Sequence, residues 1–363
     1  MPHIAVIGAG VIGLSSALRI QSEGHQVTIV ARDLLAGSET ITADQINFTS
    51  PWGGAHNRFI LPPPGDTKSA AAREHAMSLA TFQHMRSLYV RHPEAGITFM
   101  KGIEYLEAPD ETYRTLTDER ARALGLEGFR TLGESEVPEG VKYGCEYDTW
   151  CVNPMVYCAF MLRKFVFRGG RVLKRDLRDP AEAFDFKDQG KVDILVNASG
   201  NGFGDENMFI TRGQTCLVAN TCPATVTRQN ADGSWTFSVP RNFEGGTVIG
   251  GTKEPNNWDP NPSLEVREKL LQDFAATYPQ ILDSKGKITV IKDIVGRRPT
   301  RKGGMRLERE MLPGNRCIIH AYGLGGRGYE LSWGVAEGVA KLLAMQLGSR
   351  STGLASSMEK PKL

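Results

Sequence analysis

The chain has 363 residues, of which 40% are hydrophobic, and its 43 Lys and Arg against 41 Asp and Glu give a net charge of +2. A chain of this length can bury one large core or two moderate ones, and we expect two domains. The balanced charge argues against a nucleic-acid binder, and the lack of an apolar run of about 20 residues argues against a membrane span. The N-terminus enters a strand pattern without a secretory signal, so we expect an intracellular protein.

The N-terminal segment has the order strand, glycine turn, helix and strand. We predict a strand over residues 3–7, an amphipathic helix over 11–23 and a second strand over 26–31. The turn Gly8-Ala9-Gly10-Val11-Ile12-Gly13 fits G-x-G-x-x-G, in which Gly8 makes the turn, Gly10 lets the backbone approach a pyrophosphate and Gly13 lets the helix pack on the strand. This order predicts a Rossmann-like nucleotide-binding domain, and the motif alone leaves FAD and NAD open.

Two further features complete the predicted nucleotide site. Asp33 ends the second strand about twenty residues past the glycines, where an acid commonly binds the adenosine ribose. Its neighbour Arg32 leaves open which of the two side chains faces the ribose. The apolar strand Leu195-Val196-Asn197-Ala198 runs into the small residues Ser199 and Gly200, a second place where backbone can lie close to a nucleotide.

The rest of the chain alternates helical and strand-like patterns. We predict helices over residues 68–92, 154–168, 264–278 and 329–347, and strands over 288–295 and 316–320. Short β-type runs broken by Pro, Asn and Gly over 214–249 predict an antiparallel sheet of hairpins. The six cysteines show no metal-site spacing and are expected to be buried thiols, with no metal bound. The Ser/Gly/Lys-rich segment 348–363 is predicted to be a flexible tail.

One long segment carries a specific resemblance. Residues 318–328, with the sequence IIHAYGLGGRG, followed after five residues by Gly334-Val335-Ala336, resemble the signature of the D-amino acid oxidase family. Similar family blocks stand in family order at residues 49–55, 212–215, 250–252 and 295–299.

The resemblance implies an α/β fold with an α+β second domain. A discontinuous FAD-binding domain would comprise residues 1–60, 145–205 and 290–347, and an antiparallel-sheet substrate domain residues 61–144 and 206–289. It further implies non-covalent FAD, hydride transfer from a D-amino acid to flavin N5, and oxygen as the final acceptor, yielding a 2-oxo acid, ammonia and hydrogen peroxide. The resemblance also places these residues at FAD besides those named above: Ser50, Gly53, Gly54, Leu177, Gly325, Gly326, Arg327, Gly328, Tyr329 and Glu330.

The family's carboxylate-binding arginine precedes a proline in the block matched by Arg297-Arg298-Pro299, which gives Arg298 that role. A guanidinium binds a carboxylate through two parallel charge-assisted hydrogen bonds and so orients the α-hydrogen. Arg297 is expected to be a solvated charge.

Two positions depart from relatives with neutral substrates. Where those relatives often carry tyrosines, this chain has Phe237 and Lys253, the latter directly after Gly250-Gly251-Thr252. A basic residue there resembles the D-aspartate oxidase branch. At about 4 Å and an effective dielectric of about 20, a lysine attracts a carboxylate by about 4 kcal/mol before desolvation, which favours acidic substrates such as D-aspartate or D-glutamate. His56 and Arg58 follow the flavin-side segment and are further candidates to contact the side-chain carboxylate.

Several alternatives stay open at this point. The runner-up is an oxidase of neutral D-amino acids in which Lys253 faces solvent. An NAD-dependent dehydrogenase would share the glycine motif but predicts a colourless protein. A non-catalytic nucleotide-binding protein would also keep the motif but has no need for Arg298 and Lys253 in one pocket. The final Pro361-Lys362-Leu363 resembles a Ser-Lys-Leu address, which predicts the peroxisomal import receptor as a partner and the peroxisome, or otherwise the cytoplasm, as location. The sequence leaves homo-oligomerisation open.

Overall fold

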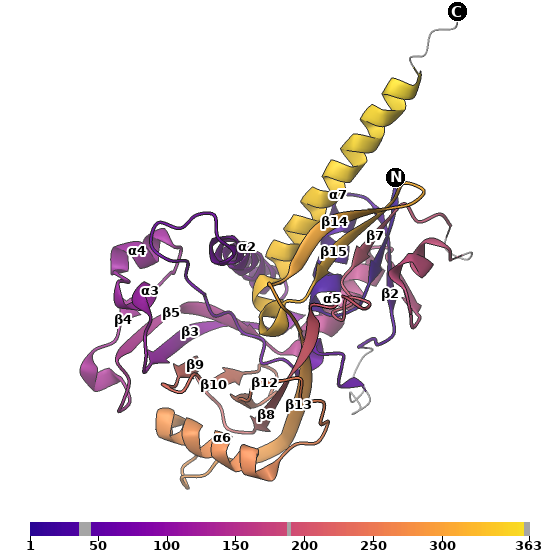
Figure 1. Cartoon of the computed structure of the whole chain (residues 1–363). Coiled ribbons are helices and arrows are strands. Elements are labelled where there is room, and N and C mark those ends of the chain that lie inside the picture. The colour runs from indigo at the N-terminus through magenta and orange to yellow at the C-terminus, as the bar shows by residue number, and fades with distance from the viewer. Residues whose placement is uncertain (36–44, 187–189, 359–363) are drawn as a thin grey trace, which may run out of the picture.

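The computed structural model describes residues 1–35, 45–186 and 190–358. Its first layer is a six-stranded sheet in the order β14-β15-β7-β1-β2-β6 (Figure 1). The sheet comprises β1 (His3–Ile7), β2 (Gln26–Ala31), β6 (Arg171–Lys174), β7 (Ile194–Asn197), β14 (Arg306–Leu312) and β15 (Arg316–Tyr322). All neighbours pair in parallel except β14 with β15. The carboxyl ends of β1, β2, β7 and β15 therefore meet at one edge, which is where ligands bind in open parallel sheets.

Helices α1 (Val11–Ser22) and α7 (Gly328–Met358) pack on the six-stranded sheet. Helix α5 (Pro154–Phe167) packs on α1, and α2 (Ala70–Arg91) packs on α7 and on strands of the second sheet. Gly334 in α7 permits the close crossing with α2, because a β-carbon there would be 2.4 Å from the Cα of Met77. The amide of Gly334 also donates a hydrogen bond to Thr81 Oγ1 at 3.1 Å. The second turn of α7 is thus fixed against the body of the molecule.

The second layer is a nine-stranded sheet in the order β12-β8-β11-β10-β9-β3-β5-β4, with β13 also paired to β8. The strands are β3 (Ile97–Leu106), β4 (Arg130–Thr131), β5 (Tyr143–Val152), β8 (Met208–Val218), β9 (Ala224–Gln229), β10 (Trp235–Pro240), β11 (Thr247–Gly250), β12 (Glu254–Pro255) and β13 (Val290–Arg301). One face packs on α6 (Leu264–Thr277) around Phe274. The shorter helices are α3 (Glu111–Arg114), α4 (Asp118–Ala123), η2 (Ser50–Trp52), η3 (Pro93–Ala95), η4 (Glu134–Glu136), η5 (Pro180–Phe184), η7 (Pro279–Ile281) and η8 (Gly325–Arg327).

The structure corrects several expectations from sequence. Strands β8 to β11 pair antiparallel as predicted, but the second sheet as a whole is mixed, because β3 pairs in parallel with β9. Strands β5 and β13, which we assigned to the nucleotide domain, are hydrogen-bonded in the nine-stranded sheet instead. Strand β14 was not predicted, since its apolar residues Leu307, Met311 and Leu312 do not recur with the period of two that marks a strand.

The C-terminal segment also differs from the prediction of a flexible tail. Helix α7 extends to Met358, where we expected the helix to end at Leu347, and its last part projects away from the body of the molecule (Figure 1). No proline interrupts residues 348–358, so the backbone can continue the helix. Residues 361–363, on which the peroxisomal prediction depends, lie outside the described part of the chain.

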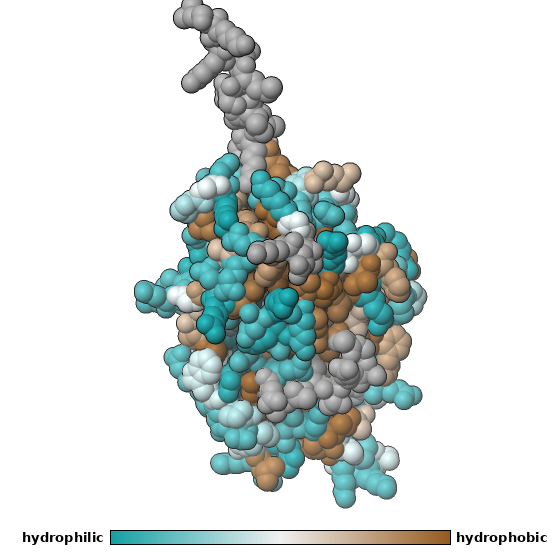
Figure 2. All heavy atoms as spheres, turned by 90° about the vertical axis from the view of Figure 1, so that its right-hand side faces the viewer, coloured by the Kyte–Doolittle hydropathy of each residue, from teal (hydrophilic) through white to brown (hydrophobic). Residues whose placement is uncertain are grey.

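The distribution of apolar and polar side chains over the surface and the interior agrees with the composition of the chain. Apolar surface gathers in the middle of the face shown in Figure 2 and hydrophilic side chains surround it. All six cysteines are buried free thiols, which confirms their predicted burial. Within residues 1–35, 45–186 and 190–358, no helix combines the length and apolar character that crossing a membrane requires. The same residues contain no group of three or more His, Cys, Asp or Glu placed to hold a metal ion.

Candidate active site

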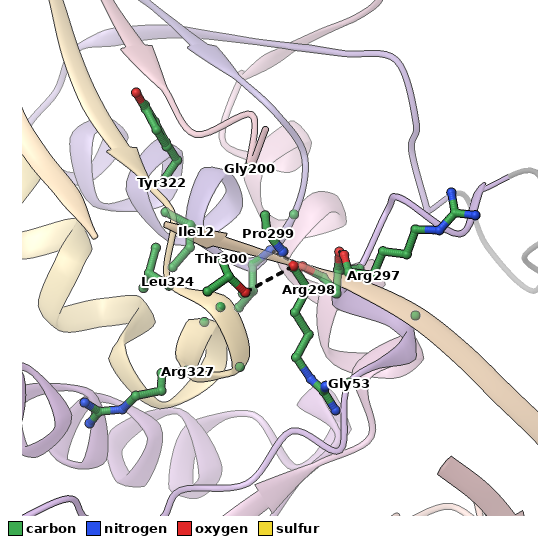
Figure 3. A pocket seen from close by; sticks show the side chains of 18 of the residues that line it. Ile12, Gly53, Gly200, Arg297, Arg298, Pro299, Thr300, Tyr322, Leu324 and Arg327 are labelled. Atoms are coloured by element: carbon green, nitrogen blue, oxygen red, sulfur yellow. Dashed lines mark hydrogen bonds between the residues drawn. The ribbon is translucent and has the colours of Figure 1, made fainter. Parts of the chain in front are cut away.

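A cavity of about 980 Å³ is lined by residues of both sheets (Figure 3). The six-stranded sheet contributes its ligand-binding edge, and the nine-stranded sheet contributes side chains of β8, β10 and β13. Every residue that the sequence predicted for the cofactor or the substrate lies in this lining except Gly13. Residues from distant parts of the chain therefore meet in one space.

The glycine turn shapes the nucleotide end of the cavity. Gly8 has φ of 104°, and a β-carbon there would be 2.4 Å from the carbonyl oxygen of Ala198. A β-carbon at Gly13 would be 1.9 Å from the carbonyl oxygen of Gly8, so Gly13 serves helix packing and lies behind the cavity wall. Helix α1 has neither a side-chain cap at Gly10 nor an acidic residue in its first turn. Its N-terminal dipole is thus open to an anion.

The end of β2 provides the predicted acid. Asp33 and Arg32 both line the cavity, and they pair with each other through Arg32 Nε and Asp33 Oδ2 at 2.9 Å. The Asp33 side chain is 19% exposed and that of Arg32 49%. The more enclosed carboxylate is therefore the better placed of the two to face a ribose hydroxyl.

The segment Thr49–Gly54 connects the nucleotide turn with the second sheet. Ser50 Oγ accepts a hydrogen bond from the amide of Val11 at 2.9 Å, and its carbonyl accepts one from the Tyr329 hydroxyl at 2.8 Å. Thr49 Oγ1 donates to the carbonyl of Arg297 at 2.9 Å. Gly54 lies against Phe237, whose ring would be 3.5 Å from a β-carbon at that position. The segment thus crosses the cavity wall from the phosphate end to the substrate end.

The first turn of α7 adds a compact group of charges. Arg327 pairs with Glu330, through Nη2 and Oε1 at 2.5 Å, and with Glu74. Burial raises the pKa of the Glu330 carboxyl, and Arg327 opposes that shift. Arg327 comes from a different wall than Arg298 (Figure 3). Its charge is compensated, which agrees with a place beside the cofactor rather than the substrate.

Arg298 is a half-buried cation without a carboxylate partner among the described residues. Its Nη1 donates to the carbonyl of Thr252 at 3.1 Å, which leaves Nε and Nη2 without partners there. Gly213 makes room for the guanidinium, since a β-carbon at 213 would be 2.4 Å from Nη2. Burial lowers the pKa of Arg298, and Glu254 partly offsets that effect. An incoming carboxylate would complete its hydrogen bonds and its charge balance.

Arg297 and Arg298 extend to opposite sides of β13, as successive residues of a strand do (Figure 3). Arg297 stacks over the ring of Trp258 at 5.2 Å and donates to the Trp258 carbonyl. Strand alternation thus makes Arg298 the member of the pair that faces the substrate end.

Lys253 and Phe237 border the substrate end differently than expected. Lys253 lines the cavity but is exposed, and no described residue pairs with it. Lys253 thus stands at the mouth of the cavity and keeps its hydration, so its attraction for a carboxylate is weaker than it would be for a buried lysine. Phe237 covers Gly250, where a β-carbon would be 2.3 Å from its Cζ atom. It offers an apolar wall with no hydroxyl.

His56 stacks on Phe237, with ring centroids 6.3 Å apart. Its Nδ1 is buried and has no hydrogen-bond partner in the described structure. Burial, reinforced by the charge of Arg58, lowers the pKa of His56 to about 4. The ring is therefore neutral at neutral pH and can still donate or accept one hydrogen bond to a ligand.

Arg58 lines the cavity with its charge already engaged. Its Nε pairs with Glu104 Oε2 at 3.1 Å, and its guanidinium stacks on Trp235 at 4.4 Å. Glu104 also accepts hydrogen bonds from the hydroxyls of Tyr113 and Tyr147. Arg58 is thus one partner of a buried ion pair. Arg298 and Lys253, in contrast, have no carboxylate partner in the described structure.

Sequence reasoning missed three parts of this site. Trp235 lines the cavity and could have been found, since it lies two residues from Phe237 and so on the same face of a strand. Gly213 lies in the family block of residues 212–215 but was given no role there, and Glu104 gave no comparable signal. Their proximity to the arginines depends on strand pairing across the sheet.

Comparisons with known proteins agree with one another. A family model described as FAD dependent oxidoreductase matches residues 3–342. The chain is 42% identical to a D-aspartate oxidase of Talaromyces thermophilus, over 94% of this chain and 95% of that protein. It is 31% identical to a D-amino-acid oxidase of Fusarium vanettenii, over 94% and 96%. The glycine oxidase structure from Bacillus cereus superposes with a TM-score of 0.71 at 15% identity, covering 95% and 96%, and shows the same fold.

The residues present fit FAD as the cofactor. The uncapped start of α1 suits a pyrophosphate, Asp33 suits a ribose, and the cavity continues from there to Arg298. A volume of about 980 Å³ lies at the upper end of the range for ligand sites, as a large cofactor and a small substrate together require. Gly8, Gly10, Asp33, Ser50 and Gly200 would hold FAD.

Proposed function

Because the chain belongs to the family of FAD-dependent oxidoreductases and is of the D-amino acid and D-aspartate oxidase kind, we propose that its preferred substrates are acidic D-amino acids, D-aspartate foremost. The broader activity is FAD-dependent oxidative deamination of a D-amino acid. The proposal concerns which side chain of the substrate amino acid the site prefers.

The proximity of two unpaired cations carries this proposal. Arg298 Nη1 donates to the carbonyl of Thr252, and Lys253 is the next residue along the chain. Consecutive Cα atoms lie about 3.8 Å apart, so the Lys253 ammonium can reach the neighbourhood of a ligand bound to Arg298. Two unpaired cations that line one cavity suit a ligand with two carboxylates on a short carbon chain.

We assign each side chain a distinct task. Arg298 binds the α-carboxylate with its free Nε and Nη2 donors and fixes the direction of the α-hydrogen. Lys253 attracts the side-chain carboxylate from the mouth, where the interaction stays sensitive to salt. His56, neutral and with a free buried nitrogen, can hydrogen-bond the same carboxylate, and Phe237 excludes water beside the α-carbon.

Bound FAD supplies a two-electron acceptor for the α-hydrogen and its electrons. The chain's own residues bind, orient and desolvate the substrate, and the site needs no further nucleophile. We propose that molecular oxygen reoxidises the enzyme. In balance, one D-amino acid, one O₂ and one H₂O give one 2-oxo acid, one ammonia and one H₂O₂.

The second candidate is an oxidase that prefers neutral D-amino acids. The exposure of Lys253 favours it, because a hydrated lysine pays no desolvation cost that only an anion could offset. The 31% identity to a D-amino-acid oxidase is also compatible with it. The two candidates predict opposite orders of substrate preference.

A substrate panel tests the proposal. The holoenzyme is mixed without oxygen with D-aspartate, D-glutamate, D-alanine or D-methionine, and the bleaching of flavin absorbance is followed. We expect fastest reduction by D-aspartate, and a fall of about tenfold in its kcat/KM for Lys253→Met with little change for D-alanine. Lys269→Met is the matched control, since Lys269 is exposed in α6 and pairs with Asp273. Faster reduction of the wild type by D-alanine would establish the second candidate instead.

A further inference from the structure

Arg241 follows β10 directly and, like Arg298, has no carboxylate partner in the described structure. Its Nη2 donates to the carbonyl of Gly53 at 3.1 Å, whereas its buried Nε has no partner. The nearby Tyr329 hydroxyl stays neutral, since burial raises its pKa well above the usual value. Burial lowers the pKa of Arg241 to about 10, so the side chain is still charged at neutral pH.

The position of Arg241 relates it to the cofactor rather than to the substrate. Arg241 does not line the cavity, but Gly53 and Tyr329, which lie beside it, do. The Thr49–Gly54 segment runs from the phosphate end at Ser50 to the substrate wall at Phe237. The part of FAD that accepts electrons must be next to the substrate, and so it belongs at the Gly53 end of this segment.

An unpaired buried cation costs stability, and hydrophobic packing of similar volume would avoid that cost. The described residues offer no carboxylate that offsets it, in contrast to Arg58 and Arg327. Such a charge beside a redox site favours the form of the cofactor that carries more negative charge, which is the reduced form. This effect is independent of the side chain of the substrate.

We propose that Arg241 is a positioning residue for the cofactor: it holds the Gly53 carbonyl and places an uncompensated positive charge behind this wall, which raises the reduction potential of bound FAD. The proposal rests on FAD as the cofactor and not on the preference for acidic substrates. If the enzyme proved not to prefer acidic substrates, the proposal for Arg241 would still stand.

Four variants of the holoenzyme test the two parts of this proposal. Arg241→Met removes both the charge and the donor, Arg241→Gln keeps a donor without charge, and Arg241→Lys keeps the charge. Arg267→Met is the matched control, because Arg267 pairs with Asp293 away from the cavity. The reduction potential is measured by equilibration with a reference dye, the FAD dissociation constant by flavin fluorescence, and thermal stability by the unfolding midpoint.

We expect Arg241→Met and Arg241→Gln to shift the potential to more negative values, while Arg241→Lys and Arg267→Met keep it near that of the wild type. Arg241→Met should also weaken FAD binding by about fivefold to tenfold through the lost donor, and Arg241→Gln should recover part of this loss. The unfolding midpoint of Arg241→Met should fall only slightly, because removal of the unpaired buried charge offsets the weaker binding of FAD. An unchanged potential in Arg241→Met or Arg241→Gln, or an equal shift in Arg267→Met, would overturn the proposal.

Discussion

Gly213 lies directly beneath Arg298, so that a β-carbon at position 213 would be only 2.4 Å from Nη2 of the guanidinium. We therefore expect Gly213→Ala to displace Arg298 and to raise KM for acidic and neutral D-amino acids alike. A loss of roughly tenfold or more in kcat/KM would correspond to weakened carboxylate binding. Steady-state kinetics measure it. Gly133→Ala is the control, because a β-carbon there meets only Glu136 Oε2, at 3.5 Å.

Replacement by lysine should lower kcat/KM to different extents at the two neighbouring arginines of β13. Arg298→Lys removes the planar pair of donors and should lower kcat/KM by about 30-fold or more for every D-amino acid, since a hydrogen-bonded charge contact is lost. Arg297→Lys changes a side chain that stacks on Trp258 at the surface, and we expect less than a threefold effect. Equal losses in the two variants would contradict the assignment of the α-carboxylate to Arg298.

The Arg58–Glu104 pair should behave as a buried ion pair. Glu104→Gln leaves a buried guanidinium uncompensated and should lower the free energy of unfolding by about 3 kcal/mol, as seen by urea denaturation with excess FAD. The double variant Arg58→Met/Glu104→Gln should recover most of this loss. If the charge of Arg58 is used by Glu104 and not by the substrate, the double variant keeps the D-aspartate to D-alanine preference of the wild type. A collapse of that preference would assign the side-chain carboxylate to Arg58.

Stability should fall in mild acid because of buried histidines. Burial lowers the pKa of His84, which stacks on Trp333, to about 4. Between pH 6.5 and 4 the unfolded chain binds a proton that the folded chain does not, so stability decreases as the pH falls through this window. This residue contributes at most about 3 kcal/mol. His84→Phe keeps the ring contact and should flatten the pH dependence of the unfolding midpoint, whereas an unchanged slope would argue against a neutral His84.

Much of this protein is encoded in local patterns. The strand, glycine turn and helix of residues 3–22 follow from hydrophobic periodicity and from the conformational freedom of Gly8, both of which are properties of adjacent residues. The helices α2, α5 and α6 lie within two residues of their predicted bounds, since Ser69, Pro154 and Ser263 give clear start signals. Arg298 and Lys253 could be singled out as well, because short blocks of sequence carry them.

The tertiary structure alone decided which of these charged residues are paired and which are exposed to solvent. Whether an arginine is paired depends on strands distant in sequence: β3 brings Glu104 to Arg58, whereas no carboxylate reaches Arg298 or Arg241 in the described structure. Likewise, Lys253 is exposed because it precedes the short edge strand β12. Burial and pairing are sums over contacts between segments that are far apart in the chain. A linear pattern therefore identifies the residue types of the site, while the fold determines which of their charges remain free to bind a ligand.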